Sequence, residues 1–184
     1  PISLAIQLYL TLVGRKGLPY RDLQGLIAHA RAHPGKINFG HGGTGSSGHF
    51  VSEVFLRTAN ISATLIPYKG ATPALNDLVA GQIDLLFLSA SSRAYIDSGK
   101  LIGFGSAAKR RVKPFLDLPT FIESGVNVSP SIWFGIIAPP GTPPDVAAKL
   151  NRAFNAAQGG TGLAERLEAN GYITNLGMSA IEFA

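Results

Sequence analysis

The chain has 184 residues, of which 46% are hydrophobic and only 15% charged, so it can bury a sizeable apolar core. Cysteine is absent, which excludes disulfides, thiolate zinc sites and a thiol nucleophile. The net charge of +5 is modest, and the basic residues are scattered apart from one run at Lys109, Arg110, Arg111 and Lys113. That run is typical of a solvated loop, so we expect no nucleic-acid partner, although a mild positive field favours anionic ligands.

The first strand is expected over residues 2–13, where apolar residues on both faces favour a buried position. This run is interrupted by Gln7 and is shorter than the roughly 18 residues that a membrane-spanning helix needs. The chain begins at Pro1 and not at Met, which suggests a processed or truncated chain.

Apolar periodicity and turn residues then predict alternating helices and strands. In chain order these are a helix over 23–33, a strand over 37–39, a helix ending near 59, a strand over 63–67, a helix over 73–80, a strand over 83–88, a short helix reaching 96 and a strand over 101–104. This alternation is typical of an α/β sandwich with a largely parallel sheet. Beyond residue 106 the pattern predicts a strand over 131–138, helices over 145–157 and 163–169, a strand over 172–176 and the start of a helix at 179.

The chain is organised around segment 36–51, in which a short strand runs into a glycine-rich loop over 40–48 and then into a helix. Either Ser46 or Ser47 suits the N-cap of that helix. Glycines let the backbone approach a ligand closely, and a helix N-terminus offers unpaired N–H groups and partial positive charge. The segment therefore predicts an anion-binding strand–loop–helix.

Two alternatives stay open for this loop. Residues 43–48 match the G-x-G-x-x-G pattern of dinucleotide-binding proteins, which would make the protein an α/β enzyme that binds a nucleotide or phosphorylated substrate at loop 40–48. That motif requires an acidic residue about 20 positions later at the end of the next strand, where this chain has Tyr68, Lys69 and Gly70. A glycine-rich turn without any ligand is the other alternative.

Three loops follow the predicted parallel strands, over 40–47, 68–72 and 88–92. Ligands of such sheets bind beyond the carboxyl ends of the strands, so we expect the three loops to open onto one crevice. His41 and His49 flank the glycine loop, so one of them could contact an anion, while His49 could equally cap or pack within its own helix. Asp84 is either a general base or a buried carboxylate that accepts from backbone amides of a neighbouring loop.

No convincing acid–base pair or nucleophile motif is present, so we predict a binding protein and not an enzyme. The acidic residues are scattered, and no G-x-S-x-G elbow occurs. His29 and His33 have the spacing of a metal pair but lack a third ligand nearby. We therefore expect no cofactor and no metal.

A series of short motifs resembles the receptors of tripartite tricarboxylate transporters, also called Bug proteins. The series comprises Pro67-Tyr68-Lys69-Gly70, Gly81-Gln82-Ile83-Asp84, Leu118-Pro119-Thr120, Glu123-Ser124-Gly125 and Trp133-Phe134-Gly135 followed by Gly141-Thr142-Pro143. Segment 34–49 looks like the carboxylate-binding loop of the same family, and the resemblance covers essentially the whole chain.

The resemblance implies a fold like that of type II periplasmic binding proteins, with two α/β lobes. A chain that lacks the usual N-terminal third would hold one nearly complete, parallel-rich lobe over 1–125, with a strand that crosses between the lobes at its start. The remainder, 126–184, would be the C-terminal portion of the other lobe. We expect this second segment to expose apolar surface, which often leads to self-association of a truncated chain.

The resemblance further implies a periplasmic, non-catalytic receptor for a small organic acid. The acid would be a dicarboxylate, a tricarboxylate or an aromatic carboxylate, delivered to a membrane transporter or a sensor. Such receptors hold the carboxylate through backbone N–H groups, hydroxyls and waters between the lobes. The residues implied are Thr44, Gly45, Ser46, Ser47 and His49 on the first loop, Tyr68, Lys69, Gly70 and Ala71 on the second, and Ser89 on the third.

Overall fold

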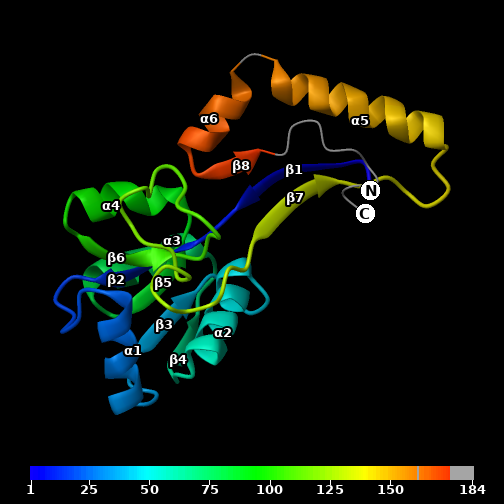
Figure 1. The fold of residues 1–184 in the computed structure, drawn as a ribbon. Coiled ribbons are helices and arrows are strands. Elements are labelled where there is room, and N and C mark those ends of the chain that lie inside the picture. The colour runs from blue at the N-terminus through cyan, green and yellow to red at the C-terminus, as the bar shows by residue number, and fades with distance from the viewer. Residues whose placement is uncertain (161, 175–184) are drawn as a thin grey trace. The chain divides into compact units, whose positions relative to one another are not determined.

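In a computed structural model of the protein, residues 1–160 and 162–174 are described, and the chain divides into two compact units (Figure 1). The larger unit is Tyr9–Pro130, and the other combines Pro1–Leu8 with the described residues from Ser131 on. The receptor lobes expected over 1–125 and 126–184 stay a prediction.

The single strand expected over 2–13 is wrong, because the structure has two strands there. Strand β1 (Ser3–Leu8) pairs with strands of the smaller unit, and β2 (Thr11–Arg15) pairs with strands of the larger one. Both halves of the segment are rich in apolar residues, so the pattern of side chains carries no sign of the change of partners.

The larger unit contains a five-stranded sheet in the order β4-β3-β5-β2-β6. Its strands are β2, β3 (Asn38–His41), β4 (Thr64–Pro67), β5 (Leu85–Leu88) and β6 (Leu101–Ser106). Strand β3 is parallel to β4 and β5, whereas β2 is antiparallel to both β5 and β6. Consequently β3, β4, β5 and β6 share one direction, which gives the parallel-rich α/β sheet expected from the sequence, with β2 reversed.

Helices cover both faces of this sheet. They are α1 (Leu23–Ala32), α2 (Ser47–Ala59), α3 (Ala71–Ala80), the short 3₁₀ helix η1 (Ala90–Ser92) and α4 (Arg93–Asp97). Leu86 of β5 packs in one apolar cluster with Leu78 of α3, while the neighbouring Phe87 packs against Phe55 of α2. Successive residues of a strand point to opposite faces, so α3 and α2 lie on opposite sides of the sheet.

Asp84, which directly precedes β5, links the start of β5 to strands β2 and β3 through its side chain. Its Oδ2 accepts from the backbone N–H of Asn38 at 2.8 Å, and its Oδ1 accepts from Nε of Arg15 at 2.8 Å. The expected acceptance from a backbone amide is present, but Asp84 is only half-buried, the amide belongs to strand β3 and not to a loop, and Arg15 adds an ion pair. Because Asp84 lies at the opposite end of β5 from the carboxyl-end loops, it takes no part in the candidate site.

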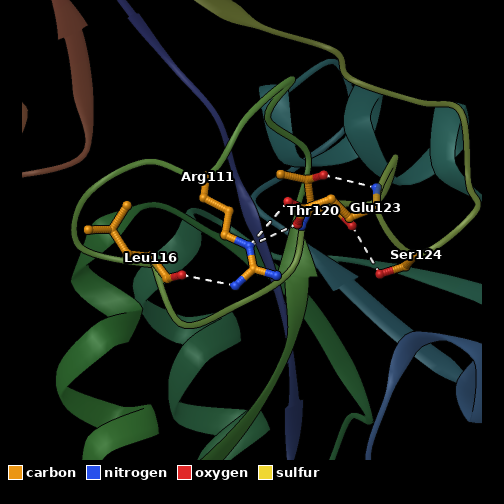
Figure 2. A network of polar contacts seen from close by, with 5 residues as sticks. All are labelled: Arg111, Leu116, Thr120, Glu123 and Ser124. Atoms are coloured by element: carbon orange, nitrogen blue, oxygen red, sulfur yellow. Dashed lines mark hydrogen bonds and ion pairs between the residues drawn. The ribbon is translucent and has the colours of Figure 1, made fainter.

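The basic run lies in the segment after β6 and is exposed, as expected of a solvated loop. Figure 2 shows how this segment is held: Nε of Arg111 donates to Oε2 of Glu123 at 2.9 Å, and Nη1 of Arg111 donates to the carbonyl of Leu116 at 3.1 Å.

Thr120 and Glu123 form a reciprocal capping box in the same segment. Oε2 of Glu123 accepts from the N–H of Thr120 at 2.8 Å, while the N–H of Glu123 donates to Oγ1 of Thr120 at 3.1 Å. The Thr120 amide and the Arg111 guanidinium lower the pKa of Glu123.

The smaller unit contains a three-stranded antiparallel sheet in the order β7-β1-β8, with β7 at Ile132–Ile136 and β8 at Tyr172–Thr174. Helices α5 (Pro144–Gly159) and α6 (Leu163–Ala169) agree with the predicted helices. Side chains of α5 bind the backbone around β1, as Asn151 donates to the carbonyl of Ile2 at 2.8 Å. The expected strand residues 175–176 and the helix expected from 179 lie outside the described residues.

Within residues 1–160 and 162–174, no helix combines the length and the apolar character that a membrane span requires.

Candidate functional site

The three loops singled out by the sequence follow strands that are neighbours in the sheet. Strand β3 lies between β4 and β5 and is parallel to both, so the loops after all three strands emerge at one edge. This edge, which we call the carboxyl edge, carries the start of α2, the start of α3 and η1.

The first two loops are in direct contact. The N–H of Tyr68 donates to the carbonyl of His41 at 2.9 Å, which extends the β3–β4 pairing into the loops. Gly42 lies so close to the second loop that an added Cβ would be 3.3 Å from the nitrogen of Ala71. Gly43 and Gly70 have φ angles of 117° and 121°, a conformation that other residues rarely adopt. Glycine is therefore needed where the two loops meet.

Helix α2 begins after the first loop, and its N-cap is Ser46, one of the two residues that the sequence predicts. Oγ of Ser46 accepts from the N–H of His49 at 3.3 Å, and the N–H of Ser46 donates to the carbonyl of Gly43 at 3.1 Å. Thr44, Gly45 and Ser47 are exposed around the helix start. Their hydroxyls, together with the amides of the first turn, can donate to an anion.

The second loop ends in another helix start. Gly70 is the N-cap residue of α3, and Ala71 is its first residue. Lys69 is exposed. Gly42 of the first loop, four residues before the N-cap Ser46 of α2, packs on Gly70 and Ala71, so the loop that leads into α2 contacts the positive end of the α3 dipole.

The hydroxyl of Tyr68 contacts the side of α3 and not its N-terminus. Its hydroxyl donates to Oδ2 of Asp77 on α3 at 2.8 Å, and its ring lies over Gly40, where an added Cβ would be 3.4 Å from Cε2. Partial burial and the hydrogen bond to Asp77 raise the pKa of Tyr68, so it stays neutral at physiological pH. The hydroxyl of Tyr68, one of the predicted site residues, therefore anchors α3 through its hydrogen bond to Asp77.

The third loop places Ser89 at the end of β5. The Oγ atoms of Ser89 and Ser91 are 3.4 Å apart, and Oγ of Ser92 donates to the carbonyl of Ser89 at 3.0 Å. This loop adds hydroxyls to the carboxyl edge on the side of β3 away from β4.

Two histidines face each other beside the α2 N-terminus. The ring centroids of His41 and His49 are 4.4 Å apart, and Nδ1 of His49 accepts from the N–H of Gly45 at 3.3 Å. His41 is only 2% exposed, and its Nδ1 has no hydrogen-bond partner in the described part of the chain. The sequence marks both histidines as neighbours of the loop, but their tilted ring contact depends on the turn at 42–46 and is not visible in the spacing.

The carboxyl edge offers hydrogen-bond donors and the positive ends of helix dipoles. Residues 1–160 and 162–174 contain no cluster of three or more His, Cys, Asp or Glu side chains that could hold a metal. His29 and His33 stack on each other at 4.4 Å, and Nδ1 of His33 is 3.1 Å from the carbonyl of His29.

Comparison with known proteins is consistent with such a site. A family profile described as "Tripartite tricarboxylate transporter family receptor" matches residues 1–181. The chain belongs to this receptor family. It is 34% identical over 179 residues to a UPF0065 protein in the tcbD-tcbE intergenic region of Pseudomonas sp. (strain P51), a match over 95% of this chain and 53% of that protein. It is also 33% identical to BugT of Bordetella pertussis, over 93% of this chain and 53% of BugT. The chain thus spans about half the length of these relatives.

Solved structures of receptors resemble the whole fold. An R. palustris protein with adipate has a TM-score of 0.85 and 29% identity, over 100% of this chain and 62% of that one. MatC from Rhodopseudomonas palustris with bound malate has a TM-score of 0.80 and 30% identity, over 95% of this chain and 60% of MatC. The periplasmic binding protein BugD has a TM-score of 0.79 and 30% identity, over 95% and 59% of the two chains.

Proposed function

We propose that the protein is a solute-binding receptor for a small organic carboxylate, which is held at the adjoining N-termini of α2 and α3. The observation that supports this proposal is the close packing of Gly42, in the loop that leads into α2, on Gly70 and Ala71 at the start of α3. Two helix dipoles and a set of exposed hydroxyls and amides favour a carboxylate over a neutral solute. Relatives bound to adipate and to malate support a dicarboxylate, and tricarboxylates and aromatic carboxylates belong to the same class.

We assign the individual residues the following roles in this proposal. Thr44, Ser46 and Ser47 donate their hydroxyl hydrogens to the carboxylate, and Gly45 donates its N–H. His49 adds a ring nitrogen, Lys69 contributes positive charge from the solvent side, and Ser89 contacts the part of the ligand that extends toward β5. Gly70 and Ala71 supply the amides of the α3 N-terminus, while Tyr68 fixes the loop through Asp77.

We propose further that the protein works in the periplasm without catalysing a reaction and passes its ligand to the membrane subunits of a tripartite transporter or to a sensor. The family description and the periplasmic binding protein BugD support this role. The competing nucleotide function is disfavoured, because the strand after the glycine loop leads into Tyr68 and Lys69 and offers no carboxylate for a ribose.

Isothermal titration calorimetry on the longest form of the protein that its gene encodes tests the proposal. The panel contains malate, adipate, citrate and benzoate, with NAD and ATP as controls. The receptor function predicts binding of at least one carboxylate and none of either nucleotide. Binding of NAD or ATP without a response to any carboxylate would overturn it in favour of the nucleotide-binding enzyme.

A further inference from the structure

The His41–His49 pair contains a buried ring nitrogen without a hydrogen-bond partner among the described residues, which a simple anion site does not need. His41 is 2% exposed, yet its Nδ1 has no hydrogen-bond partner in the part of the chain that the structure describes. The centroid of its ring lies 4.4 Å from that of His49 in the first turn of α2, and the two ring planes are tilted by 34°. Buried polar atoms normally have a partner, so this nitrogen marks the carboxyl edge as a place that receives a polar occupant.

The hydrogen bonds of His49 define its protonation in the free protein. Its Nδ1 accepts the N–H of Gly45 at 3.3 Å, a geometry that requires a lone pair on Nδ1, while Nε2 lies 3.8 Å from Oε1 of Glu53. An imidazolium donates from both nitrogens and cannot accept from Gly45. The free loop therefore favours the neutral ring.

A bound carboxylate reverses this preference. An oxygen at the α2 N-terminus can accept from the N–H of Gly45, which releases Nδ1 of His49 from its role as acceptor. Nδ1 can then carry a proton and donate it to the same carboxylate as a charge-assisted hydrogen bond. The neutral ring of His41 stacks on the resulting imidazolium and stabilises it as an aromatic partner of a cation.

We propose that the site takes up its carboxylate together with one proton, which comes from solvent and resides on His49, and that His41 is the residue that positions the His49 ring. This inference rests on the proposed function, and it adds a regulation by pH. His49 is the member that takes the proton because it is partly exposed and faces Glu53, whereas His41 is buried. Two stacked imidazolium charges would repel each other, so the pair takes up a single proton.

Other charges around the pair are compatible with this assignment. Glu53, on α2 itself, favours the imidazolium, as does the bound carboxylate. Strand β5, which packs on α2, is apolar throughout, and the loop after β4 carries Lys69, which opposes a second positive charge. The turn that packs on α2 through Phe121 and Phe55 carries Glu123, which is already paired with Arg111.

Calorimetry with malate and adipate over about pH 5.5 to 8.5, the range in which imidazoles titrate, tests the inference. We expect affinity to rise as pH falls, by at most about tenfold per pH unit for one proton. Titration in two buffers of different ionisation enthalpy should give about one proton taken up per ligand in the middle of the range. His49→Gln, which keeps an acceptor for Gly45 but cannot take a proton, should bind with an affinity that does not depend on pH.

Variants at His41 separate positioning from general stability. His41→Phe retains the stacked ring and should keep the pH dependence, whereas His41→Ala should lose most of it while remaining folded by circular dichroism. Carboxylate binding without any pH dependence or proton uptake overturns the inference and leaves the proposed function intact. An unchanged pH profile in His41→Ala overturns the positioning role of His41. If neither malate nor adipate binds at any pH, both the coupling and the dicarboxylate assignment fail.

Discussion

Ser46 has two tasks at the start of α2, and they can be separated. Its Oγ lone pair accepts the N–H of His49, which caps the helix, while the proposed function has its hydroxyl hydrogen donate to the carboxylate. Ser46→Ala removes both functions. An aspartate at this position retains the cap but places a negative charge against the carboxylate.

Replacing Ser46 and Ser47 by alanine should weaken malate binding by about ten- to a hundredfold, since each charge-assisted hydrogen bond contributes roughly 1–3 kcal/mol. Ser46→Ala should also lower the free energy of unfolding by about 1 kcal/mol through the lost cap. Ser46→Asp should unfold like the wild type and bind no carboxylate. Calorimetry combined with urea unfolding checks both effects, and a stability loss in Ser46→Ala without any loss of affinity would contradict the ligand role.

Lys69 is exposed, so its charge is screened by solvent. Lys69→Ala should therefore weaken carboxylate binding only about two- to fivefold, and raising the salt concentration to about 0.5 M should remove most of the difference. A hundredfold loss that persists in high salt would show that Lys69 contacts the ligand in a dry site.

At the scale of elements, the sequence predicts the helices well because their signals are local. The N-cap at Ser46, the apolar stripe of α2 and the stop at His33 all lie within a few residues of the boundary that they define. Pairing of strands is different, because it is decided by distant partners. The switch from β1 to β2 and the stacking of His41 on His49 both depend on contacts that residue spacing does not encode.

The contact between the first two loops makes Gly42 a test of how the helix starts are positioned. Gly42→Ala should push the second loop away, because the added Cβ would lie 3.3 Å from the nitrogen of Ala71 and 3.4 Å from the carbonyl carbon of Gly70. We expect at least about a threefold loss of malate affinity and a lower melting temperature. Gly159→Ala, where an added Cβ meets nothing within 4 Å, is the matched control and should leave binding unchanged. Wild-type affinity in Gly42→Ala would contradict the role of this contact.

The capping box after β6 gives a prediction for pH (Figure 2). The pKa of Glu123 is lowered in the folded protein, so the stability that it contributes is present above its unfolded pKa of about 4.3 and is lost as pH falls through the lower folded value. Glu123→Gln should therefore lower the urea midpoint near neutral pH, and the difference from wild type should shrink in acid. A difference that is the same at neutral pH and near about pH 2.5 would contradict this account.

At the scale of the whole molecule, the smaller unit exposes large apolar side chains. Phe134 is 53% exposed, Ile137 75% and Leu150 47%. Exposed apolar surface of this kind favours association, so the 184-residue chain should form dimers or larger species at micromolar concentration. Light scattering checks this, with Ile137→Lys and Leu150→Lys as a variant that should shift the chain toward monomer. A monomeric, protease-resistant wild-type chain would contradict the prediction.

The central claim, that a carboxylate binds where the starts of α2 and α3 adjoin, is tested most directly by mapping the NMR shifts of backbone amides during a malate titration. The account predicts that the largest shifts fall on the amides of Gly45, Ser46, Ser47 and Ala71, and that they saturate with a single affinity. Addition of NAD should leave these amides unchanged. Saturating shifts that leave the α2 and α3 starts untouched and gather on other elements would contradict the claim.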